Sequence, residues 1–132
     1  MKETLKGKWS YRSFRHDPII VKDGHVEGDP ELAKPWSPPG VLEVDTNEAG
    51  EITGKLTFTE EVVLDIKGRI VPATDNEPVS VELTGEFHSS VNKLKGVFIP
   101  GSNHIVGTIL NTADDLAKQP VGTAGPFVLF PI

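Results

Sequence analysis

The chain contains no cysteine, which excludes disulfides, thiolate metal sites and a cysteine nucleophile. It also lacks a long hydrophobic run, because its apolar stretches are only a few residues long and a membrane-spanning helix needs about 20. The first residues, Met1 to Gly7, include no apolar core of the kind found in signal peptides. We therefore expect a cytoplasmic protein that does not insert into a membrane.

An excess of basic residues is absent too. Thirteen Lys and Arg stand against nineteen Asp and Glu, which gives a net charge of −6. An acidic chain repels the phosphates of nucleic acids and the surface of anionic membranes, so neither is expected as a partner. The length of 132 residues is suited to one domain with one core, and residues 1–132 are expected to form a single domain.

What the sequence does contain is a repeated pattern in which glycine lies between two apolar residues, each two positions away. The pattern occurs six times, centred on Gly7, Gly54, Gly68, Gly85, Gly96 and Gly107. Strand side chains alternate, so each glycine shares a face with its apolar neighbours. Glycine weakens a flat strand, but on the inside of a strongly curved sheet a side chain would crowd the opposite wall. The repeat predicts a small closed barrel, with a two-sheet sandwich as the alternative.

Short apolar runs bounded by Gly, Pro, Asn and Asp predict an all-β chain with mostly short connections. Such connections favour an eight-stranded antiparallel up-and-down β-barrel. Strands are expected at 5–15, 41–46, 51–59, 62–71, 78–90, 93–99, 104–111 and 126–131. One short helix is expected near the C-terminus, at 112–119, and a single helical turn at 29–33. The segment 16–40 is expected to be a long loop folded over one barrel mouth.

Particular motifs in these strands suggest a family. The first strand contains Gly7-Lys8-Trp9, and later strands contain Ile52-Thr53-Gly54 and Leu83-Thr84-Gly85. In these motifs the chain resembles small calycin-type barrels, and most closely the avidin and streptavidin group. The resemblance implies a streptavidin-like barrel, but not biotin binding. Tyr11 and Arg15 stand about where avidins have the Asn and Ser that hold biotin, and the stacking tryptophans of the later strands are missing.

The inward face of the first strand changes from apolar to polar along its length, because Leu5 and Trp9 are followed by Tyr11, Ser13 and Arg15. An apolar floor with a few polar groups at its mouth is typical of a small-molecule site. We therefore expect a small, partly apolar ligand, anionic if a guanidinium holds it. The residues expected to line this site are Tyr11, Ser13, Arg15, Trp36, Phe58, Ser89 and Asn111.

Other roles for these residues stay open. Arg15 could instead pair with Asp17 at the surface, and Trp36 could simply plug the core. An eight-stranded barrel is just wide enough to be either hollow or filled. The sequence therefore allows a binding protein, a metal-independent isomerase or lyase that uses the same cavity, or a structural or interaction protein with a filled barrel.

No catalytic residue, metal site or cofactor is predicted. His16 and Asp17 are adjacent on an extended chain and point apart, which makes them a poor acid–base pair. Asp23, His25 and Glu27 could offer metal ligands in the long loop, but zinc needs three or four fixed ligands. His88 falls on the outward face of its strand and is expected at the surface. Neither a phosphate-cradling glycine loop nor a Gly-x-Ser-x-Gly turn is present.

The outward face of the last strands is apolar. Val97, Ile99, Val106 and Leu110 point outward, and residues 127–130 are apolar on both faces. A contiguous apolar wall on the outside of a domain usually marks an interface. We expect a homodimer or higher oligomer formed through strands 93–111 and 126–131. The alternative is that the helix or the 16–40 loop covers this wall.

Overall fold

The computed structural model describes residues 5–15, 20–22, 25–27, 34–35, 38–113 and 121–132. In this part of the chain the long strands are β1 (Gly7–Arg15), β5 (Gly40–Thr46), β6 (Glu51–Thr57), β7 (Val63–Val71), β8 (Ser80–Phe87), β9 (Ser90–Phe98), β10 (Ile105–Ala113) and β11 (Ala124–Pro131). Three shorter strands lie between β1 and β5 in the sequence: β2 (Ile20–Lys22), β3 (His25–Glu27) and β4 (Lys34–Pro35).

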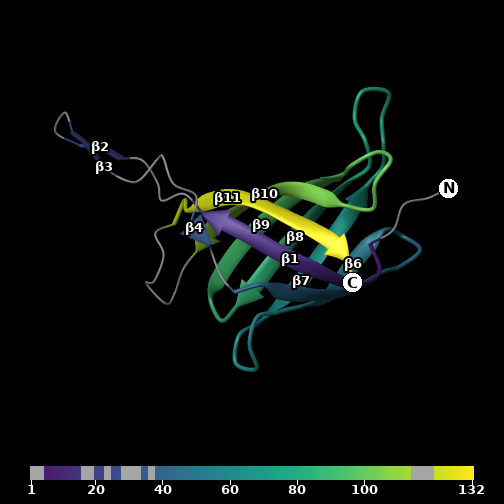
Figure 1. The fold of residues 1–132 in the computed structure, drawn as a ribbon, viewed down its shortest axis with the longest axis horizontal. Coiled ribbons are helices and arrows are strands. Elements are labelled where there is room, and N and C mark those ends of the chain that lie inside the picture. The colour runs from purple at the N-terminus through teal and green to yellow at the C-terminus, as the bar shows by residue number, and fades with distance from the viewer. Residues whose placement is uncertain (1–4, 16–19, 23–24, 28–33, 36–37, 114–120) are drawn as a thin grey trace.

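The eight long strands form one closed antiparallel barrel (Figure 1). From β5 to β11 each strand pairs with the next in sequence, and β1 closes the barrel by pairing with both β5 and β11. The expected all-β, eight-stranded, up-and-down barrel is confirmed, and the sandwich alternative is wrong. The short strand β4 pairs with the end of β1, while β2 and β3 pair only with each other among the described strands.

Three expectations about the chain between these strands need comment. Thr112 and Ala113, expected to begin the C-terminal helix, belong to β10, and the rest of that expected helix lies outside the described residues. The single helical turn expected at 29–33 also lies outside them. The segment 16–40 is not wholly a loop, because it contains β2, β3 and β4.

The two ends of the barrel differ in their connections. At one end, here called the turn end, lie the connections 47–50, 72–79 and 99–104. At the other, here called the loop end, lie the connections 58–62 and 88–89 and the C-terminal ends of β1 and β10. Leu5 is fully buried at the turn end, where the Thr46 hydroxyl accepts a hydrogen bond from its N–H and donates one to its carbonyl.

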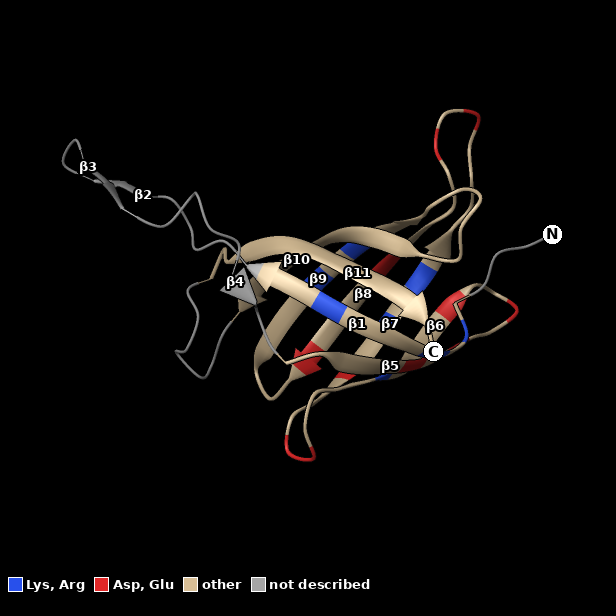
Figure 2. Ribbon diagram, viewed as in Figure 1, with Lys and Arg blue, Asp and Glu red and all other residues tan. Residues whose placement is uncertain are grey.

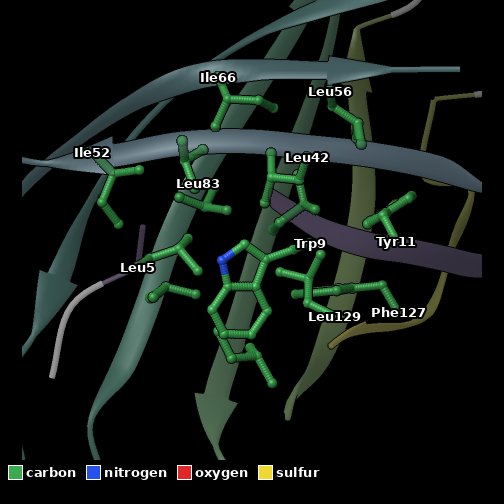
Figure 3. Close-up of a cluster of buried hydrophobic side chains, with 14 of the residues drawn as sticks. Leu5, Trp9, Tyr11, Leu42, Ile52, Leu56, Ile66, Leu83, Phe127 and Leu129 are labelled. Carbon is green, nitrogen blue, oxygen red and sulfur yellow. The ribbon is translucent and has the colours of Figure 1, made fainter. Parts of the chain in front are cut away.

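Aliphatic side chains fill most of the interior (Figure 3). Trp9 lies among Leu5, Leu42, Leu83 and Leu129, and its indole N–H donates a hydrogen bond to the carbonyl of Lys6 at 2.9 Å. No charged side chain is buried among the residues that the structure describes, and charged residues occur along the strands and in the turns (Figure 2). The turn-end half is therefore a packed hydrophobic core.

The repeated glycines have a different physical reason from the expected one. A Cβ on Gly54, Gly68 or Gly107 would overlap a backbone carbonyl oxygen of the neighbouring strand and not a side chain of the opposite wall. At Gly85 and Gly96 a Cβ would press mainly against interior side chains. Glycine at these positions lets adjacent strands of a small, strongly bent barrel come close together.

Gly7 is an exception among the six. It is exposed instead of lying on the buried face, and nothing lies within 4 Å of where its Cβ would be. Its φ of 87° is in the left-handed region, which side chains disfavour. Gly7 is thus explained by backbone conformation at the start of β1 and not by packing.

Candidate functional site

Polar side chains enter the barrel interior at the loop end. Across the described residues, the buried polar side chains other than Tyr11 are Ser13, Asn92, Asn111 and Thr123. Each lies where a strand meets the loop end: late in β1, early in β9, late in β10 and just before β11. The polar layer therefore covers one end of an otherwise aliphatic core.

An aromatic cluster forms the floor of this layer. The Tyr11 ring meets Phe58 edge to face at a centroid distance of 5.8 Å and stacks on Phe127 at 6.0 Å. Gly40, opposite Tyr11 on β5, makes room for this arrangement, since a Cβ there would lie 2.9 Å from the Phe58 ring. Tyr11 of β1, Phe127 of β11 and Phe58, which follows β6, thus form one aromatic cluster in the barrel.

The Tyr11 hydroxyl is buried without a hydrogen-bond partner in the described part of the chain. Only 1% of the residue is exposed. Burial raises the pKa of Tyr11 to about 12, and the nearby Ser13 hydroxyl, which does not meet hydrogen-bond geometry with the phenol, lowers it by a smaller amount. The phenol therefore stays protonated at neutral pH and keeps an unused O–H donor.

Asn111 has an unused acceptor. Its Nδ2 donates to Asn92 Oδ1 at 3.1 Å and to the Ala113 carbonyl at 3.3 Å, with Ser90 Oγ at 3.5 Å. The Ala113 carbonyl can only accept, so it fixes which side of the amide carries the nitrogen. The Oδ1 atom is buried and receives no hydrogen bond from the described residues. A register shift between β9 and β10 falls at Asn111 and Ala113, where such a bulge re-aims side chains.

The structure brings together several of the expected site residues. Tyr11, Ser13 and Asn111 are buried at the loop end, and Phe58 packs against the core beside them. The inward placement expected for Ser89 is wrong. β8 ends at Phe87, His88 has a φ of 56°, and Ser89 is exposed in the turn to β9.

The structure does not describe the side chains of two further residues that were expected in the site. Arg15 ends β1, but its side chain lies outside the described structure, as does Trp36. Asn92 was not expected in the site. The alternation of side chains along β9 could have predicted it, because Asn92, Leu94 and Gly96 are two residues apart and therefore share the buried face of the strand.

The described residues contain no group of three or more His, Asp or Glu side chains that could hold a metal ion. The possible ligands and acid–base groups of the long loop (His16, Asp17, Asp23, His25 and Glu27) have side chains outside the described structure. His88 is exposed, as expected.

Within the described residues, no helix has the length and apolar character needed to cross a membrane.

A hollow lies on the outer wall, with a volume of about 480 Å³. Its rim alternates in charge across neighbouring strands, in the paired order Glu51, Arg69, Glu82 and Lys95. Arg69 and Glu82 form a salt bridge of 3.2 Å on exposed side chains. Opposite charges in cross-strand pairs stabilise a sheet by themselves, so this hollow is explained without a ligand.

No protein-family model matches this chain, and a search of curated proteins also returned no match. Its function is therefore inferred from the barrel's own residues.

Proposed function

We propose that the protein binds a small, partly apolar molecule at the loop end of its barrel. The observation that carries this proposal is the gathering of buried polar side chains at one end, where Tyr11 and Asn111 each have a polar atom without a partner. A buried polar group without a hydrogen bond costs about 1–3 kcal/mol. Two such groups at one end of a core are accounted for if a bound molecule supplies the missing partners.

The alternative functions fit the described residues less well. A filled, purely structural barrel matches the turn end, where Leu5 and Trp9 close the core, but gives no reason for polar groups at the loop end. An isomerase or lyase needs a titratable group that can exchange a proton near neutral pH. Tyr11 is the buried titratable side chain of the described interior, and its pKa of about 12 makes it unsuitable for that task.

Native mass spectrometry of freshly purified protein tests the binding proposal. We expect a mass excess that disappears after denaturation and refolding in clean buffer. Tyr11→Phe should retain less of the bound compound, whereas Ser10→Ala, a change on the outward face of the same strand, should retain as much as the natural chain. Bare protein mass in every preparation would contradict the proposal.

We also propose that two copies associate through the outer wall of β9, β10 and β11. Val97, Val106 and Val128 are paired neighbours across these strands, and Phe130 continues the apolar surface along β11. Val106 and Leu110 are each about two-fifths exposed, at 37% and 41%. An apolar patch of this kind is self-complementary under two-fold symmetry, which makes a second copy the simplest partner.

We further propose that the barrel is of the calycin type and close to the avidin and streptavidin group. Support comes from the up-and-down order of eight strands and from the buried Trp9 in a first strand that begins Gly7-Lys8-Trp9. The proposal concerns the fold, since one fold serves many functions.

A further inference from the structure

We propose that the group of the ligand that enters the loop-end layer is neutral and offers both a hydrogen-bond acceptor and a donor, as a carboxamide or lactam does. This inference rests on the proposed binding function and specifies its chemistry. Two observations support it. The Tyr11 hydroxyl and Asn111 Oδ1 are buried without hydrogen-bond partners, and none of the buried residues that the structure describes is charged.

Tyr11 requires an acceptor from the ligand. Its ring is held on two sides by Phe58 and Phe127, so the hydroxyl has a fixed position beyond the aromatic floor. The hydroxyl is protonated and has no acceptor among the described residues. A carbonyl oxygen of the ligand would accept its proton without placing a net charge in the core.

Asn111 requires a donor from the ligand. Its nitrogen already donates to Asn92 Oδ1 and the Ala113 carbonyl, and half a turn of the amide would lose the bond to Ala113, whose oxygen can only accept. The remaining atom, Oδ1, can only accept. A ligand N–H or O–H would satisfy it, whereas a carboxylate or phosphate oxygen facing it would be repelled.

A charged ligand group would also lack compensation in this layer. The described side chains there (Tyr11, Ser13, Asn92, Asn111 and Thr123) are all neutral. Moving an ion from water into such surroundings is strongly unfavourable unless an opposite charge accompanies it. These surroundings therefore favour a neutral polar group attached to an apolar or aromatic body.

Three aromatic probes of similar size separate these possibilities. Benzamide offers an acceptor and a donor, acetophenone offers an acceptor alone, and benzoate carries a negative charge. Binding of each to the full-length protein would be measured by NMR titration at neutral pH. We expect benzamide to bind most tightly, acetophenone about three- to tenfold more weakly, and benzoate more weakly still, since one hydrogen bond contributes about 0.5–1.5 kcal/mol.

Tyr11→Phe gives the protein-side test. It should weaken benzamide and acetophenone alike by about three- to tenfold, because both use the phenol. The variant should fold at least as stably as the natural chain without ligand, since it removes a buried hydroxyl that has no partner. Ser10→Ala is the control and should leave the order and strength of binding unchanged.

Because Tyr11 is the sole tyrosine, its ring vibrations in ultraviolet resonance Raman spectra report the state of this one hydroxyl. We expect a free hydroxyl without ligand and a donating one with benzamide. Benzoate binding as tightly as benzamide would overturn the inference and leave the binding proposal intact. A hydroxyl that already donates, with no change on adding benzamide, would show that water satisfies Tyr11 and would also overturn the inference. Failure of every probe, together with bare protein mass in native spectra, would overturn both proposals.

Discussion

At the scale of single residues, Tyr11 combines a stabilising ring with a destabilising hydroxyl. The ring packs between Phe58 and Phe127, while its oxygen is held away from water without a partner. Proteins keep such groups where function requires them more than stability does. The same residue therefore links the energetics of the core to the proposed site.

The raised pKa of Tyr11 predicts how stability depends on alkaline pH. The unfolded chain releases the phenol proton near pH 10, but the folded chain does so only at about 12. Between these values the unfolded state binds fewer protons, so the free energy of unfolding falls as pH rises. Relative to Tyr11→Phe, the natural chain should lose roughly 3 kcal/mol across this range, at about 1.4 kcal/mol per unit of pKa.

Urea unfolding of both proteins at several pH values from 8 to 12 checks this prediction. Direct titration of tyrosine absorbance gives the pKa independently, because the chain has one tyrosine. Parallel stability curves for the two proteins, or a tyrosine that ionises near pH 10 in the folded state, would contradict the burial argument.

Sequence alternation placed Tyr11, Ser13 and Asn111 correctly because each lies within a strand whose other inward residues are apolar. It failed at Ser89 because alternation ends where a strand ends, and the turn begins at His88. The missing partners of Tyr11 and Asn111 could not be predicted, since they depend on which atoms of distant strands meet.

At the scale of elements, the barrel strands were predicted, whereas the short strands of the long connection were missed. All eight barrel strands were expected within a few residues, because apolar alternation and turn residues act locally. Ile20–Lys22 and His25–Glu27 are separated by Asp23-Gly24, a common hairpin sequence that would have indicated β2 and β3. At Thr112 pairing outweighed the helix-capping signal, and its hydroxyl donates to the Val91 carbonyl of β9 at 3.2 Å.

The contacts between neighbouring strands predict that replacing glycine by alanine lowers stability much more at Gly107 than at Gly85. In Gly107→Ala the new Cβ would overlap the Lys95 carbonyl, so β9 and β10 must move apart. In Gly85→Ala it would meet only the ends of Leu64 and Ile66, at 3.1 and 3.2 Å, which can rotate. We expect Gly107→Ala to lose about 1–3 kcal/mol of stability, and Gly85→Ala to change little because a stiffer unfolded chain offsets mild crowding.

Urea denaturation followed by tryptophan fluorescence would compare the two alanine variants with the natural chain. Equal losses would indicate that the glycines relieve crowding in the shared interior, as the sequence alone suggested. A large loss confined to Gly107→Ala would support close strand approach as the reason for the repeat.

At the scale of the whole molecule, the acidic residues of the barrel wall are confined to β5, β6, β7 and β8, which also contain Lys55, Lys67 and Arg69 (Figure 2). The strands β1, β9, β10 and β11 contain five basic residues and no acidic one: Lys8, Arg12, Arg15, Lys93 and Lys95. Asp and Glu are instead found on β5 to β8. The apolar wall proposed as an interface therefore lies within a cationic half of an acidic protein.

This arrangement predicts an unusual response of self-association to salt. A two-fold contact through Val97, Val106 and Val128 brings like charges such as Arg12 and Lys95 from both copies to one interface. Salt screens their repulsion but does not weaken apolar contact. The dimer fraction measured by light scattering should therefore rise as ionic strength increases from about 0.01 M, where the Debye length is about 30 Å, to 1 M, where it is about 3 Å.

A matched pair of substitutions tests whether association depends on the apolar wall of β9, β10 and β11 or only on the net charge of the protein. Val106→Lys adds a cation at the centre of the apolar row and should leave the protein monomeric at all salt concentrations. Thr53→Lys adds the same charge on β6, an exposed position in the other half, and should associate like the natural chain. If salt dissolved the dimer, the contact would be electrostatic and would involve the acidic residues, because screening weakens attraction between opposite charges. If both variants behaved alike, the apolar wall would not be the contact.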